Sequence, residues 1–189
     1  MAKIKLSKKQ IKQIENFALN YYRTLDETHG IEHAERTTKL AEYLAKKEGA
    51  DLQITRLGAL LHQFHNGKFV KKSLRKIKVD EEISNKLAEI AECSWAKKLE
   101  MKGKSIEAKV VWDADKLQVI GVFGIIREIT CNMWPRKMGF REALKYTRTI
   151  EQKIYNTLQT KTAKKLAKNP HEFVLKFWKI FDKWDKAKL

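Results

Sequence analysis

Two histidines and one aspartate are the side chains in this sequence whose positions suggest chemistry. Four of the five histidines lie between positions 29 and 65. His33 shares a helical stripe with Leu40 and Leu44, so we expect it to point inward. His62 directly follows an apolar run, and Asp115 lies on the apolar stripe of a third segment. We therefore expect all three side chains to be buried.

A buried carboxylate is costly unless a cation, a metal or a set of hydrogen bonds compensates it. Two inward imidazoles and one inward carboxylate, contributed by three helices, could converge on a metal ion inside a helical bundle. Two simpler interpretations stay open at this point. Each histidine could be a hydrogen-bonded core residue, and Asp115 could be neutralised by Arg36 or Arg127.

The segments that must position these residues nearly all have helical periodicity. The 189 residues include two prolines and eight glycines, and no stretch alternates convincingly as a strand. No internal repeat or low-complexity linker divides the chain. The sequence therefore predicts an all-α fold, with residues 1–189 forming a single helical bundle domain.

Capping residues and apolar periodicity predict seven helices. They are a first helix that starts after the N-cap Ser7, helices over 31–48 (closed by Gly49), 51–65, 80–91, 105–130 and 140–158, and a last helix opening at Pro170. We expect a basic loop over 66–79, and a central, fully buried helix over 105–130. The last helix is expected to bury Phe173, Phe177, Phe181 and Trp184.

The charge of the chain favours anionic partners. Forty Lys and Arg residues against 23 Asp and Glu residues leave a net charge of +17. Such a balance suits nucleic acids, nucleotides or other phosphorylated small molecules, although lysines that are merely solvated give the same composition. No apolar run is long enough to cross a membrane, and the N-terminus does not resemble a signal peptide. Cys93 and Cys131 lack metal-type spacing, so we expect a reduced, cytoplasmic protein without membrane contact.

Three motifs resemble those of the HD superfamily of metal-dependent phosphohydrolases, particularly its small bacterial and archaeal branch. The segments that carry the resemblance are Thr28–Arg36, Glu48–Asp51 with Gly58–His62, and Asp113–Leu117 with Ile120 and Gly121. Weaker similarities lie at Cys93–Trp95 and Thr160–Ala167. Together they cover most of the chain in the family's order.

The resemblance implies an all-α fold and a site for a divalent ion, namely Mn, Ni, Co, Fe, Zn or Mg. It implies metal ligation by His33, His62 and Asp115, and a metal-bound water that attacks a phosphate ester or anhydride, often of a nucleotide. It places His29 in the same pocket. The residues expected to contact the substrate are His29, Arg36 and Lys68.

The sequence departs from the family pattern at two acidic positions. The His-Asp doublet of the family reads His62-Gln63, and Gln118 replaces another acid. An amide oxygen is a neutral, weaker ligand than a carboxylate. If Gln63 still takes the catalytic position beside Asp115, the site could be altered but active, with His65 as an additional nitrogen ligand. Alternatively, the chain is an inactive HD-fold protein that binds a nucleotide, a nucleic acid or a protein partner. Substrate identity and oligomeric state are not predicted.

Overall fold

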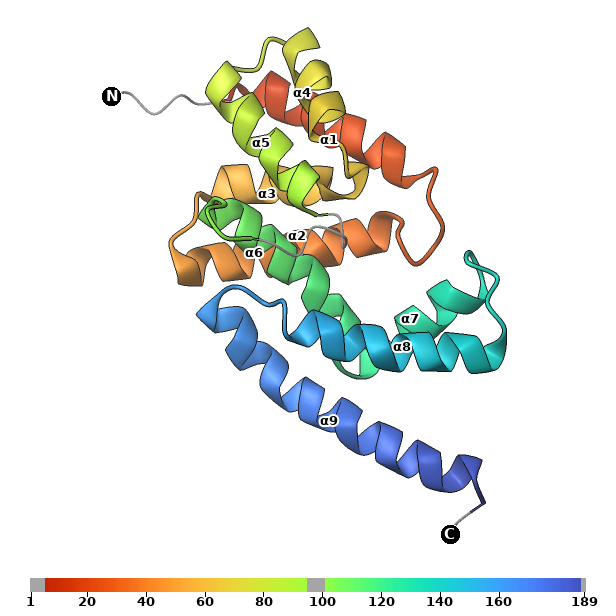
Figure 1. Ribbon diagram of the computed structural model, residues 1–189. Helices are drawn as coiled ribbons and strands as arrows, with labels where there is room; N and C mark the ends of the chain where they lie inside the picture. The colour runs from red at the N-terminus through yellow and green to blue at the C-terminus, as the bar shows by residue number, and fades with distance from the viewer. Residues whose placement is uncertain (1–5, 95–100, 188–189) are drawn as a thin grey trace. The chain divides into compact units, whose positions relative to one another are not determined.

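The computed structural model describes residues 6–94 and 101–187, and within these residues every regular element is helical. The helices are α1 (Lys8–Tyr22), α2 (Ile31–Glu48), α3 (Leu52–Leu61), α4 (Gly67–Lys76), α5 (Glu81–Cys93), α6 (Ile106–Lys116), α7 (Gly121–Met133), α8 (Phe140–Tyr155) and α9 (Lys161–Asp185). Two short 3-10 helices, η1 (His62–Phe64) and η2 (Leu117–Val119), follow α3 and α6 (Figure 1). The predicted all-α class is confirmed. No helix in the described ranges combines the length and apolarity that crossing a bilayer requires.

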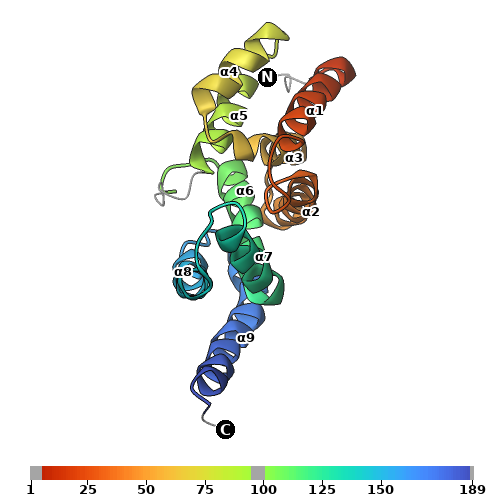
Figure 2. The ribbon, with the colours of Figure 1, turned by 90° about the vertical axis from the view of Figure 1, so that its right-hand side faces the viewer.

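The chain divides into two compact units, residues 1–114 and 115–189, at a boundary inside α6. In the first unit, α3 packs against α1, α2 and α5, and α4 packs against α5 (Figure 2). In the second unit, α7 packs against both α8 and α9. The core of the second unit contains Ile125, Leu144, Val174 and Trp178.

Local capping explains why α1 and α3 begin, and α2 ends, where the sequence predicts, whereas α3 ends at Leu61, before the predicted end at residue 65. The Ser7 side chain accepts a hydrogen bond from the Gln10 backbone N–H, and the Gln10 Oε1 atom accepts one from the Ser7 backbone N–H. Asp51 accepts hydrogen bonds from two backbone N–H groups at the start of α3. Gly49 ends α2 in the left-handed conformation, with φ of 73°. These contacts fix the ends of the two helices that carry His33 and His62.

The predicted basic loop over 66–79 is wrong, because residues 67–76 form α4. Asn66 caps this helix by accepting a hydrogen bond from the Phe69 N–H. Val70 and Leu74, one turn apart, are buried. The lysines that suggested a loop are the solvated face of an amphipathic helix.

The predicted continuous helix over 105–130 is also wrong, because the chain turns between α6 and α7. Gly121, the first residue of α7, has a φ of +86°, which L side chains rarely adopt. Val122 and Ile126 are 54% and 62% exposed, so α7 is not the fully buried helix that its composition suggested. A long apolar run does not by itself distinguish a central helix from a broken one.

The last helix begins earlier than predicted. Thr160 caps α9 through a hydrogen bond from the Ala163 N–H, which places Pro170 inside the helix rather than at its first position. This changes which face is buried. Phe173 and Trp184 are 45% and 69% exposed, whereas the buried residues are Ala163, Ala167, Val174 and Trp178. Phe177 and Phe181 are only partly buried against the core.

Candidate metal centre

His33 and His62 face each other from α2 and from the end of α3. Both side chains are 0% exposed, as the sequence predicted. Their Nε2 atoms lie 3.2 Å apart, and the two rings meet edge-on at 68°. Two inward-pointing nitrogens at this distance either share one proton or share one cation.

The hydrogen bonds of His62 decide which of its nitrogens faces the centre. Its Nδ1 atom lies 2.6 Å from the Ala59 carbonyl oxygen and 3.1 Å from the Tyr22 hydroxyl. A carbonyl oxygen only accepts, so Nδ1 carries the proton. In a neutral imidazole, the lone pair is then on Nε2, the atom directed at His33. This second-sphere arrangement is the one that metal-bound histidines usually have.

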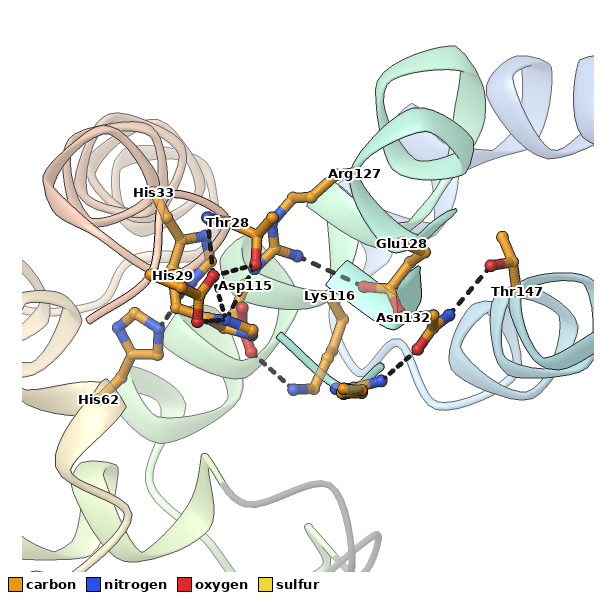
Figure 3. A network of polar contacts seen from close by, with 12 residues as sticks. Thr28, His29, His33, His62, Asp115, Lys116, Arg127, Glu128, Asn132 and Thr147 are labelled. Carbon is orange, nitrogen blue, oxygen red and sulfur yellow. Dashed lines mark hydrogen bonds and ion pairs between the residues drawn. The ribbon is translucent and has the colours of Figure 1, made fainter. Parts of the chain in front are cut away.

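Asp115 is the third member of the group that could hold a metal ion. It lies at the end of α6, one residue beyond the part of that helix that belongs to the first unit. One ligand atom from each of His33, His62 and Asp115 lies within 4.8 Å of the others (Figure 3). Asp115 is 8% exposed, and its Oδ2 atom is 2.6 Å from the ammonium nitrogen of Lys116. This lysine is a partner that the sequence reasoning did not consider.

The donor atoms fit a divalent ion. Two nitrogens bound to one ion at about 2.1 Å, at octahedral or tetrahedral angles, lie about 3.0–3.4 Å apart, and the observed separation is 3.2 Å. Two imidazoles and one carboxylate form a ligand set that first-row divalent metals accept. A shared ion would also satisfy three polar groups that are otherwise costly to bury together.

His29 lies beside this group and is held by Asp26. The His29 Nδ1 atom donates to Asp26 Oδ2 at 2.9 Å, and the His29 ring is edge-on to the His33 ring, with centroids 6.2 Å apart. Burial raises the pKa of Asp26, but hydrogen bonds from Thr28 and His29 and the charge of His29 outweigh it, so the net pKa is lowered. Asp26 is therefore an ionised anchor that fixes the orientation of His29.

Other predicted site residues lie elsewhere in the structure. His65, in the left-handed conformation after η1, is not part of the His-His-Asp group. It lines an open surface pocket with the exposed Lys68 and with Lys71. Lys71 pairs with Glu81, and hydrogen bonds from Arg75 and Lys71 lower the pKa of Glu81 to about 2.

Two further predicted site residues, Arg36 and Gln63, lie close in sequence to His33 and His62. Arg36 pairs with Glu32, one turn away on α2, at 3.1 Å. Gln63 directly follows His62 in η1 and is partly buried. Its role beside the group remains a prediction.

Sequence reasoning missed three residues that contact the candidate ligands or His29, namely Tyr22, Asp26 and Lys116. A detectable signal existed only for Asp26, because an aspartate two residues before a threonine favours the turn in which Asp26 Oδ1 accepts from the Thr28 N–H at 2.9 Å. Tyr22 reaches His62 across 40 residues of sequence, a contact that periodicity cannot predict.

Comparison with known proteins finds one matching family model and several similar chains. Residues 30–120 match the family model described as the HD domain. The chain is 29% identical over 194 residues to the uncharacterized protein YpgQ of Bacillus subtilis, with 93% of each chain covered. The structure of YpgQ in complex with ADP is similar at a TM-score of 0.75, over 93% of this chain and 94% of that one, with 27% identity.

Two other solved structures agree. A protein from Lactobacillus plantarum is 25% identical and has a TM-score of 0.82, with 97% of this chain and all of the other covered. An HD-superfamily hydrolase from Bacillus thuringiensis is 25% identical and has a TM-score of 0.71, over 95% and 98% of the two chains. The segment that matches the family contains His33, His62 and Asp115, and the likeness to solved relatives extends over nearly the whole chain. Over residues 30–120 this chain is similar to the HD domain, and over nearly its whole length it is similar in fold to these solved structures.

Proposed function

We propose that this protein is a metal-dependent phosphohydrolase whose substrate is a nucleotide or another phosphate ester or anhydride. The observation that carries the proposal is the convergence of His33, His62 and Asp115 within 4.8 Å, in a chain with an HD domain. A divalent ion held there would lower the pKa of a bound water and supply a hydroxide nucleophile near neutral pH.

Residues of the chain would hold the ion and bind the substrate. His33 and His62 present their Nε2 atoms to the ion, and the Ala59 carbonyl holds His62 in the required tautomer. Asp115 supplies the negative charge. His29, oriented by Asp26, is placed to contact a phosphate oxygen, and we assign it the substrate-binding role.

A nucleotide is the preferred substrate class for two reasons. The B. subtilis relative has a structure in complex with ADP. The chain carries 40 Lys and Arg residues against 23 acids, a balance that attracts polyphosphates.

The test is to purify the protein without a chelator or histidine tag and to measure its metal content. The protein is then incubated with ATP, ADP and deoxynucleotides, and the products are followed by phosphorus NMR. We expect about one ion per chain and release of phosphate or pyrophosphate, both lost in His33→Ala. Metal-loaded protein that hydrolyses no member of the panel would contradict the proposal.

Gln63 favours one alternative, an HD-fold protein that binds a nucleotide without hydrolysing it. Since an amide neither carries a charge nor accepts a proton as a carboxylate does, the change removes a group that could orient the attacking water. Calorimetric binding of ADP, with no product formed over hours, would favour this alternative.

A further inference from the structure

We infer that α9 docks on the surface of an anionic membrane, lying along the lipid–water interface without crossing the bilayer. The inference concerns the second unit alone and does not depend on the proposed function. It is carried by an apolar stripe that the fold leaves uncovered, by the lysines beside this stripe, and by the types of side chain that form it.

α9 has a second apolar face besides the one that packs in the core. The buried core face consists of Ala163, Ala167, Val174 and Trp178. The second face, which we call the α9 stripe, consists of Leu166, Phe173, Ile180 and Trp184. These four side chains are between 40% and 69% exposed. Their spacing of seven, seven and four residues places them on one line of the helix, over a length of about 27 Å.

The fold of the second unit does not need the α9 stripe. α7 and α8 pack against α9 from one side, and the core face supplies Val174 and Trp178 to that contact (Figure 1). In the described part of the chain, the α9 stripe therefore has no packing partner. A line of large exposed apolar side chains of this length is typical of an interaction surface.

The side chains beside the α9 stripe are positively charged. α9 contains seven lysines, and all seven are exposed. Lys176 and Lys183 follow Phe173 and Ile180 by three residues, so each lies one turn further along the same side of the helix. A partner of the α9 stripe therefore meets apolar and cationic groups side by side.

The acidic residues of the second unit do little to offset these lysines. Two of the three acids in α9, Asp182 and Asp185, pair with Arg148 and Arg141 of α8. Residues 115–189 contain 17 Lys and Arg against 7 Asp and Glu, a net charge of +10 out of the +17 of the chain. The charge of this unit thus favours an anionic partner.

The side chains of the α9 stripe favour a lipid surface over a partner helix. Paired helices need residues such as Leu, Ile or Val that fit between the side chains of the facing helix, whereas Phe173 and Trp184 are large and aromatic. Helices that lie on anionic membranes combine Trp, Phe and Leu on one face with Lys and Arg on the other. A second copy of the chain is disfavoured, because it would bring the lysines of two copies together.

This inference replaces the expectation of a protein without membrane contact. That expectation came from the lack of an apolar run long enough to cross a bilayer. A helix at the lipid–water interface needs no such run, because only its apolar face enters the boundary between headgroups and acyl chains.

The test uses the full-length protein with lipid vesicles, without added metal or nucleotide. Binding is measured by cosedimentation with vesicles of phosphatidylcholine and with vesicles that contain equal amounts of phosphatidylcholine and phosphatidylglycerol. We expect the protein to bind the anionic vesicles at least about tenfold more tightly than the neutral ones. Because the attraction is partly electrostatic, binding should weaken as the salt concentration rises.

A pair of tryptophan variants tests the apolar part of the surface. Trp184→Ala is expected to weaken binding to the anionic vesicles by about tenfold, since an interfacial aromatic anchor is lost. Trp134→Ala is the matched control, because Trp134 is more exposed than Trp184 but lies outside α9. We expect this control to bind within about twofold of the unmodified protein.

A pair of charge-reversal variants tests the basic part. Changing Lys176 and Lys183 together to Glu should weaken binding by at least about twenty-five-fold, at about fivefold for each lysine. Lys8 and Lys9, exposed at the start of α1, give a control with the same change in net charge. We expect this control to weaken binding by less than about fivefold.

Three outcomes would overturn the inference. The first is equal binding to neutral and anionic vesicles, or binding to neither. The second is an equal loss in the two lysine variants, which would assign the binding to overall charge. The third is a dimer seen by light scattering that becomes a monomer in Trp184→Ala, which would assign the α9 stripe to a second copy. Circular dichroism verifies folding, and the comparison of the two lipid mixtures tests the inference even if a variant fails to fold.

Discussion

The close contact between α3 and α5 at Gly58 makes a quantitative prediction about stability. Gly58 lies one helical turn before His62, and a Cβ atom there would come within 2.4 Å of Ile90 Cδ1 and 3.0 Å of Ile90 Cγ2. Ile90 is 1% exposed. In Gly58→Ala, a gain of about 1 kcal/mol in helix propensity opposes an overpacking cost of about 1–3 kcal/mol. We expect a net loss of about 1 kcal/mol in the free energy of unfolding.

A double-mutant cycle combines Gly58→Ala with Ile90→Val, which removes Ile90 Cδ1, the atom nearest to the added methyl group. Ile90→Val deletes Cδ1 and by itself costs about 0.5–1.5 kcal/mol. In the double variant the alanine methyl fills the space that Cδ1 leaves, so we expect stability within about 0.5 kcal/mol of the unmodified protein. Independent effects would instead leave the double variant about 2 kcal/mol less stable, so the coupling energy is about 1.5–2 kcal/mol.

Urea unfolding followed by circular dichroism measures all four proteins, with the midpoints compared at constant m-value. The stripped proteins are then titrated with Ni²⁺, since Gly58→Ala should displace His62 and weaken binding, and Ile90→Val should restore it. Additive destabilisation in the double variant would refute the description of this contact.

Further predictions concern the second unit and the core. Burial raises the pKa of Glu151, and its hydrogen bond and charge pairing with His171, at 2.9 Å, only partly offset this. The folded state therefore binds this proton more tightly than the unfolded state, and stability should fall as pH rises above about 4.5, the ordinary value. Glu151→Gln keeps an acceptor for His171 and should flatten that slope in thermal unfolding measured between pH 4.5 and 7; an unchanged slope would exclude Glu151 as its source. Trp112, 1% exposed, should cost about 3–5 kcal/mol when changed to alanine, whereas Trp134, 81% exposed, should cost less than about 0.5 kcal/mol, as measured by urea unfolding. Equal losses would contradict the burial assigned to these two side chains.

The burial of the three ligands could be predicted from local sequence because each lies on a periodic apolar face. Helix starts were predicted correctly at the cap residues Ser7, Asp51 and Asp80, but those at the cap residues Asn66 and Thr160 were not. The errors arose where a local signal had a second physical reading. Lysines over 66–79 were compatible with a loop or with an amphipathic helix, and only the burial of Val70 and Leu74 decides between them.

The break at Gly121 and the internal position of Pro170 escaped prediction for the same reason. A Cβ atom on Gly121 would come within 2.9 Å of Pro170 Cβ, so the two positions are close in space although 49 residues separate them. Glycine permits both the positive φ and this approach, and neither requirement is visible in the run of apolar residues around it. The break at Gly121 and the position of Pro170 therefore depend on contacts between distant segments, which the local sequence pattern does not show.

The residues that contact the candidate metal ligands could not be predicted from the local sequence either. His33 and His62 are placed by their own helices, but the tautomer of His62 depends on Ala59 and Tyr22, and the charge of Asp115 depends on Lys116. A motif therefore identifies which residues could reach an ion, while their neighbours would decide how strongly each one binds it. In this chain the one carboxylate of the group is paired with Lys116. Gln63→Asp would add a negative charge at the position after His62 in the sequence, and we expect it to alter ion preference more than it alters the fold.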